Sequence, residues 1–346
     1  MDKKIRAKRI DWIDISKGLT ILLVIIGHSD IRSILRGAIF SFHMPLFFIL
    51  SSTTYKCSTN NDELLNKSEK AFLHLFLAVI GIYLIKTTIT IIIDFTYLSS
   101  LPLYNIKIYV GNIINVFIVG SGVPTNIGNT VIEPIGIPWF LMVLFFGRCL
   151  FDYLHLKLNN KWFYTSIVLF SIIGLCLGKI QWLPFSFDIA LAIQLFFLFG
   201  QWLKNYNMEK EALKTIIISS IIWSSLFLYT YIIKNSYLEL ACRCYPLFPI
   251  CYIYAISGTM MLSSFSQIIS KFDFLCGPIK YLGRNSLIML WVHCFDKYFE
   301  FAYRLSSHGL VNAIIRIVID LGIFALIILL IDHEKFWCKF RKKTDM

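Results

Sequence analysis

The sequence predicts an all-α integral membrane protein, a bundle of about ten transmembrane helices. Hydrophobic residues make up 57% of its 346 residues and charged residues 16%, against about 45–50% and about 25% in soluble domains. The mean hydropathy is +0.68. Apolar stretches of about the 20 residues that cross a bilayer recur along the whole chain. We expect spans at residues 12–29, 34–55, 71–95, 137–155, 162–178, 185–203, 214–234, 245–267, 281–300 and 311–332.

The net charge of +12 indicates membrane topology rather than a nucleic-acid partner. With the N-terminus in the cytoplasm, the inward segments hold most of the lysines and arginines, including the runs at residues 3–9 and 335–343. This is the asymmetry that the positive-inside rule describes. We therefore expect both termini in the cytoplasm. No soluble domain of useful size remains outside the spans, so residues 1–346 are expected to form a single membrane domain.

One long connection, residues 96–136, contains three prolines and several glycines and asparagines. The expected topology places it outside the cell. Loops of this length are usually functional or disordered, and this one is the natural place for an acceptor platform or a lid. Nine cysteines show no metal-ligand spacing, so we treat them as small apolar residues and expect no metal site.

The first span carries ionisable side chains, Asp14 and Lys17 near its start and His28 at its end. A central Lys or Asp costs roughly 2.5–3.5 kcal/mol on insertion scales, so such residues mark function by default. On a helix, Lys17 and His28 differ by about 20° and lie ~16 Å apart, and Asp14 falls about 40° away. All three share one stripe, which should face the bundle interior or a water-filled cavity.

The second span repeats this pattern, with His43 near its middle and Arg36 about 20° away on the same helix. Pro45 frees a backbone carbonyl one turn earlier and is expected to bend the helix there. A lone histidine on an apolar face is usually structural. Two histidines on consecutive spans, each with charged neighbours, favour a shared site.

Four segments carry a resemblance to a known family: residues 9–29 with Asp14, Lys17, Gly27 and His28, Phe42-His43-Met44-Pro45-Leu46-Phe47-Phe48, Ile137-Pro138-Trp139-Phe140-Leu141, and Leu282-Gly283-Arg284-Asn285-Ser286 with His293. Over the whole chain, the sequence resembles the membrane-bound acyltransferase-3 family, most closely its sugar O-acetyltransferase branch, often described as fucose-acetylase-like. Many members carry an Arg-x-x-Arg pair between the second and third spans, where this chain has only Lys56, Lys67 and Lys70.

The resemblance implies a multi-pass protein of the bacterial plasma membrane. Such a protein moves an acyl group, usually acetyl, from cytoplasmic acyl-CoA to a hydroxyl of a glycan or related envelope molecule. It implies acetyl-CoA as the donor, a glycan as the acceptor, and His28 as the catalytic residue.

The residues support this chemistry independently of the family. Acyl transfer needs a base to take the hydroxyl proton and donors for the oxyanion. Histidine, with an unperturbed pKa of about 6.5, suits the base role, and His28 is our choice. Its partner should come from another span; His43, Ser29 and Asp30 are the nearest candidates in sequence. Asp14 lies about 21 Å along the helix, too far to orient His28 directly.

Two arginines are candidates for binding the thioester oxygen or the CoA phosphates, Arg148 in the fourth span and Arg284 in the ninth. The alternatives are a structural ion pair or a side chain that reaches the membrane interface. Lys17 is expected to hold a CoA phosphate at the inner mouth; otherwise it snorkels or pairs with Asp14.

The remaining candidates are assigned to substrate binding: Asp14, Trp139, Asn285 and His293. Each has a plainer alternative. Trp139 is typical of an interface belt, Asn285 could cap the ninth helix, and His293 could be structural. Two other functions stay open, a transporter or flippase for a glycan precursor and a non-catalytic sensor. A transporter predicts broken helices at corresponding positions in both halves, and no such pair is evident. The sequence does not specify the acceptor.

Overall fold

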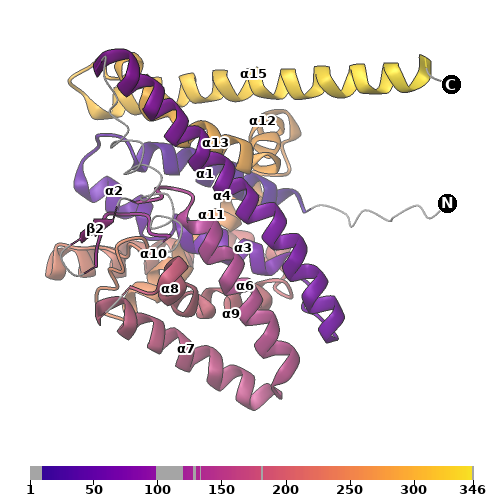
Figure 1. Cartoon of the computed structure of the whole chain (residues 1–346). Helices are drawn as coiled ribbons and strands as arrows, with labels where there is room; N and C mark the ends of the chain where they lie inside the picture. The colour runs from indigo at the N-terminus through magenta and orange to yellow at the C-terminus, as the bar shows by residue number, and fades with distance from the viewer. Residues whose placement is uncertain (1–9, 99–119, 128–129, 133, 181, 345–346) are drawn as a thin grey trace. The chain divides into compact units, whose positions relative to one another are not determined.

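The computed structural model confirms the all-α class, since most of the described residues are helical. It describes residues 10–98, 120–127, 130–132, 134–180 and 182–344. The long helices, labelled in Figure 1, are α1 (Asp11–Gly27), α4 (Asn61–Leu98), α6 (Trp139–Lys157), α7 (Asn160–Ile180), α10 (Met208–Lys234), α11 (Ile250–Ile269) and α15 (Gly309–Thr344). The shorter helices are α2 (Ser33–Phe40), α3 (His43–Thr53), α8 (Phe187–Ala192), α9 (Gln194–Leu203), α12 (Asp273–Arg284), α13 (Ser286–Phe295) and α14 (Glu300–Tyr303), with the 3₁₀ turns η1 (Pro184–Ser186) and η2 (Asp296–Phe299).

Six helical segments of the described residues are long and apolar enough to cross a membrane, and a bent pair would make seven. This confirms a multi-pass membrane protein and leaves the number of ten spans a prediction. The predicted spans outside this set correspond to α1, to α11 and to the α12–α13 pair. α1 has only 17 residues, α11 is rich in serine near its end, and the ninth predicted span is interrupted.

The chain folds as two compact units, which we call the terminal unit (residues 1–39 and 263–346) and the central unit (residues 40–262). Within the terminal unit, α1 packs along α12 and also contacts α13 and α15. Gly18 and Gly283 permit this close approach: a Cβ on Gly283 would overlap the Asp14 carbonyl, and one on Gly18 would overlap that of Ile279. Glycine is required where two backbones approach this closely.

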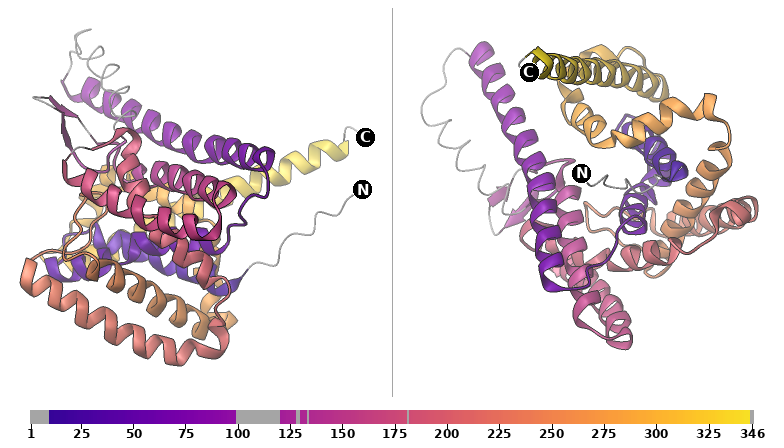
Figure 2. Two further views of the ribbon diagram at one scale, coloured as in Figure 1. Left: turned by 90° about the horizontal axis from the view of Figure 1, so that it is seen from below. Right: turned by 90° about the vertical axis from the view of Figure 1, so that its right-hand side faces the viewer.

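Within the central unit, α3 packs against α9, α7 against α8 and α9, and α4 against α6. Figure 2 shows α4 and α6 side by side, in the colours of residues 61–98 and 139–157. The helices are held by aromatic contacts, such as the stacked rings of Phe196 and Tyr252, 4.6 Å apart. The strands β1 (Thr125–Ile127) and β2 (Thr130–Ile132) pair antiparallel in the long connection. Most of that connection, including residues 99–119, lies outside the described residues.

Three predicted spans, the second, the sixth and the ninth, are not continuous helices, and the sixth, residues 185–203, is bent by 51° between α8 and α9. The second breaks at residues 41–42 between α2 and α3, so the helical angle between Arg36 and His43 does not apply. Pro45 is the third residue of α3; because the first turn of a helix lacks intrahelical donors in any case, proline is tolerated there and does not bend it. The ninth predicted span breaks at Asn285, between α12 and α13.

Candidate active site

His28 marks the end of α1 in the terminal unit. Its backbone N–H still donates to the Val24 carbonyl at 3.0 Å, but its φ of −87° and ψ of 3° leave the helical region. The chain then turns, and the Ser29 hydroxyl donates back to the Ile25 carbonyl at 2.8 Å. The imidazole of His28 is exposed. The local sequence thus places a histidine on a helix end, where its ring can meet a ligand.

The imidazole of His293, on α13, lies beside that of His28, with ring centroids 5.3 Å apart and planes tilted by 44°. His293 is buried, and its Nδ1 lies 2.8 Å from a carboxylate oxygen of Asp296. The Nε2 atom of His293 has no hydrogen-bond partner among the described residues. When Nδ1 carries a proton and donates it to Asp296, Nε2 of the neutral ring is left as an acceptor.

Arg316, on α15, ties this pair to the end of α1. Its guanidinium binds both oxygens of Asp296, at 2.6 and 2.7 Å, and donates to the His28 carbonyl at 2.7 Å. Such two-point Arg–carboxylate contacts are strong and geometrically specific. Arg316 therefore fixes the position of the His28 backbone relative to Asp296. Because Asp296 contacts His293, the position relative to His293 is fixed as well.

Asp320 completes the cluster. It lies one helical turn after Arg316 on α15, is fully buried, and approaches His293 Nδ1 at 3.8 Å. Arg316 balances one of the two carboxylates, and the other has no basic residue bonded to it among the described residues except His293. The cluster thus favours one added proton, on His293 or on Asp320, because burial penalises a charge that has no partner.

The same three side chains, His293, Asp296 and Asp320, lie close enough together to hold a metal ion. The ion pair with Arg316 already uses both oxygens of Asp296. Arg316 therefore accounts for the burial of that carboxylate without a metal ion.

The other predicted residues of the terminal unit gather near the first turn of α1. Asp14 is buried and accepts from Arg284 Nε at 2.9 Å, and Lys280 on α12 pairs with Asp11. Asp14 and Arg284, both predicted to bind substrate or donor, thus form an ion pair with each other. This is the structural alternative that the sequence left open for Arg284. Lys17 lies half-buried on the same helix.

Asn285 occupies the break between α12 and α13. Its side-chain amide donates back to the Tyr281 carbonyl at 3.0 Å and makes no cap bond to α13. The capping alternative for this residue is therefore not what the structure shows, and a role in binding substrate stays a prediction.

Three predicted site residues, His43, Arg148 and Trp139, belong to the central unit. His43 begins α3, is buried, and lies 4.7 Å from the Phe40 ring. Arg148 donates to the Ser51 hydroxyl, stands 5.0 Å from the Tyr55 ring, and has a buried Nε with no partner among the described residues. Trp139 is 6% exposed and covers Gly122.

A polar cluster lies next to Arg148 in the central unit. The carboxylate of Asp152 is fully buried and accepts from the Tyr55 hydroxyl, the Ser58 amide and the Ser58 hydroxyl, at 2.5–2.7 Å. Burial, and then the charge of Asp152, raise the pKa of the nearby Cys57 thiol to about 11. Because only the thiolate is a strong nucleophile, Cys57 is unsuited to carry an acyl group at neutral pH.

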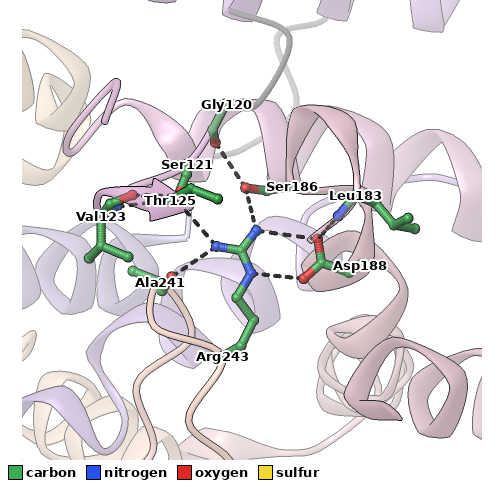
Figure 3. Close-up of polar contacts among 9 residues, drawn as sticks. All are labelled: Gly120, Ser121, Val123, Thr125, Leu183, Ser186, Asp188, Ala241 and Arg243. Carbon is green, nitrogen blue, oxygen red and sulfur yellow. Dashed lines mark hydrogen bonds and ion pairs between the residues drawn. The ribbon is translucent and has the colours of Figure 1, made fainter. Parts of the chain in front are cut away.

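A second buried network surrounds Arg243 in the central unit (Figure 3). Arg243 donates to both oxygens of Asp188, at 2.8 and 3.2 Å, and to the Ser186 hydroxyl at 3.0 Å. It also donates to Ser121 and stacks 3.8 Å over the Trp182 ring. The guanidinium of Arg243 thereby links its own connection to those around residues 121 and 186.

Sequence reasoning missed Asp296, Arg316 and Asp320. The signal was present, since Arg316 and Asp320 are charged residues four apart inside an apolar run, the same kind of evidence that singled out His28. Their link to His28 was not available from spacing, because 288 residues separate it from Arg316. His28 has its ring contact with His293 of α13, and a partner among His43, Ser29 and Asp30 stays a prediction.

A comparison with protein-family models gives one finding. The model described as an acyltransferase domain, acyltransferase-3, matches residues 10–332. The match covers essentially the whole chain, including both histidines and α15 as far as residue 332. No curated protein and no solved structure matches the chain.

Proposed function

The chain belongs to the acyltransferase-3 family, and we propose that it is an acyl-CoA-dependent O-acyltransferase. It transfers an acyl group, with acetyl as our first choice, from acyl-CoA to a hydroxyl of a cell-envelope or exopolysaccharide sugar. The observation that carries this proposal is the position of His28 beside the buried His293–Asp296 pair. An exposed imidazole backed by a buried, negatively charged cluster is suited to general base catalysis. The proposed location is the bacterial plasma membrane.

In the proposed step, His28 removes the proton from the sugar hydroxyl while the oxygen attacks the thioester carbonyl. The oxygen–carbon bond forms, a tetrahedral intermediate collapses, and the carbon–sulfur bond breaks. The proton on His28 passes to the sulfur of CoA, so the base is regenerated. His293, Asp296 and Asp320 stabilise the imidazolium between these events, because their summed charge is negative once Arg316 is counted.

The donor is proposed to bind toward the first turns of α1. Lys17, half-buried on α1, supplies the positive charge for a CoA phosphate. The ~16 Å between Lys17 and His28 along α1 leaves room for an extended pantetheine arm between phosphate and thioester. His43, Arg148, Trp139 and Asn285 remain predicted contributors to binding or to oxyanion stabilisation.

The test uses purified full-length protein with acetyl-CoA and an envelope glycan preparation, following both free CoA and acetylated glycan. His28→Ala should lower the rate at least ~100-fold, the lower range for general base catalysis, with an unchanged elution profile. Cys57→Ala should leave the rate unaltered, because that thiol stays protonated at neutral pH. A His28→Ala variant with wild-type turnover would refute the mechanism.

One observation favours a second candidate, a transporter or flippase for a glycan precursor. The helices α8 and α9 are together long and apolar enough to cross a membrane, but they are bent by 51° at their junction. Broken helices form the substrate sites of many transporters. Glycan movement into protein-containing vesicles without release of CoA would favour this function over acyl transfer.

A further inference from the structure

The central unit has a groove that the proposed acyl transfer does not use. It has a volume of about 740 Å³, within the roughly 300–1,000 Å³ of small-molecule sites. The groove runs between α7, α9 and the start of α11, with the end of α6 at its base. Figure 1 shows α7 and α9 next to each other, and the two helices are in contact. Tyr164 and Trp202, at 54% and 52% exposure, stand on its open side.

The lining separates into an apolar length and a polar end. The apolar wall is formed mainly by Phe163, Leu195, Leu198, Phe199, Tyr252 and Ile256. His155, Asn160 and Asn205 line it near the connection between α6 and α7 and just beyond the end of α9. A ligand that fits this lining has a long hydrocarbon part and a polar head.

The polar end is positively charged. Lys157, Lys161 and Lys204 are exposed and lie within two residues of His155, Asn160 and Asn205. Between residues 153 and 208 the only acidic residue is Asp188, which is buried in its pair with Arg243. Of the two acidic residues that border this stretch, Asp152 is buried and hydrogen-bonded to Ser58, and Glu209 is exposed in the first turn of α10. Trp162 and Trp202 are exposed nearby, as is usual where a helix meets the headgroup layer.

We propose that this groove binds one acyl chain of an anionic phospholipid, with the phosphate at Lys161 and Lys204. Each lysine near a membrane surface raises the affinity for an anionic headgroup by about one order of magnitude or less. The lysines therefore select the lipid by the charge of its headgroup. The apolar wall holds the chain whatever the headgroup. The lysines and the apolar wall thus make different contributions, headgroup selection and chain binding. Substitutions in each part can therefore test them separately.

The experiment is native mass spectrometry of the delipidated full-length protein with equal amounts of dioleoyl phosphatidylglycerol and dioleoyl phosphatidylcholine. The wild-type protein should retain phosphatidylglycerol about tenfold more than phosphatidylcholine. Lys161→Gln with Lys204→Gln should remove most of this preference. The matched control is Lys210→Gln with Lys214→Gln on α10, an equal loss of charge at exposed positions outside the groove.

A second pair of variants tests the apolar wall. Leu198→Trp should fill the groove and lower retention of both lipids, whereas Ile172→Trp, on the exposed side of α7 and outside the lining, should leave it unchanged. Equal retention of the two lipids by the wild-type protein would overturn the proposal. So would an equal effect of the control lysine pair, or unchanged lipid binding in Leu198→Trp.

Discussion

At the scale of single residues, the proposed mechanism makes the protonation of His28 depend on the charge around His293. The proposed mechanism assigns two negative charges to Asp296 and Asp320 and one positive charge to Arg316, and all three side chains are buried. His28 shares a ring contact with His293, so it experiences the remaining negative charge. Removing a carboxylate should therefore make the imidazolium of His28 less stable.

Asp320→Asn tests this effect on pH dependence. Loss of a negative charge lowers the pKa of His28, so the acidic limb of the kcat/KM profile should move to lower pH, by about one unit at an effective dielectric constant of about 20. The turnover at the optimum should also fall. The measurement is the rate of CoA release between pH 5 and 9.

The matched control for this variant is Asp62→Asn, an exposed residue in the first turn of α4, which should leave the limb in place. An Asp320→Asn protein whose acidic limb stays at the wild-type pH, or moves to higher pH, would contradict the assigned role of the cluster.

At the scale of elements, the pairing of α1 with α12 depends on close backbone approach. Gly283→Ala places a methyl group where the Asp14 carbonyl lies, so the helices must separate. Overpacking of this kind typically costs about 1–3 kcal/mol, and we expect a lower midpoint of thermal unfolding in detergent. The ion pair of Arg284 with Asp14 would be disturbed as well.

Gly322→Ala on α15 is the control for this substitution, because a Cβ there meets nothing within 4 Å. It should leave stability unchanged or raise it by up to about 1 kcal/mol through helix propensity. Equal unfolding midpoints for the two alanine variants would show that α1 and α12 are not held at the distance described.

The network of Arg243 gives the second prediction at this scale. Arg243→Met leaves the buried carboxylate of Asp188 without its partner, which typically costs about 3–5 kcal/mol. Arg304→Met removes an exposed pair with Glu300, where the arginine side chain is 66% exposed, and should have no measurable effect. Thermal unfolding of the two variants compares them directly; similar midpoints would exclude Arg243 as a major stabilising residue.

At the scale of the whole molecule, the number of spans determines on which sides the termini lie. Six or ten spans place both ends on the same side, whereas seven would place them on opposite sides. The lysine and arginine asymmetry predicts that both are cytoplasmic. Alkaline phosphatase, which is active only outside the cytoplasm, should therefore be inactive when fused at either end and active when inserted between β1 and β2. An active fusion at one end only would exclude an even number of spans.

Much of this protein follows from local sequence. Apolar runs predict the helical class and the membrane, because burial in lipid depends on composition over about 20 residues. Charged residues within such runs identified His28 and Lys17, since each is costly there. The predictions failed where the helix period was extended across a break, as between Arg36 and His43, because a turn of two residues resets the helical angle.

The sequence alone determined the all-α membrane class, the family blocks and the histidine that ends the first helix. Only the tertiary structure decided which residues surround that histidine. His293, Asp296, Arg316 and Asp320 lie 265 to 292 residues further along the chain, and periodicity gives directions only within one helix. The tertiary structure also decided that Asp14 pairs with Arg284. A buried charge pairs with the nearest opposite charge, and helix packing determines which residue that is.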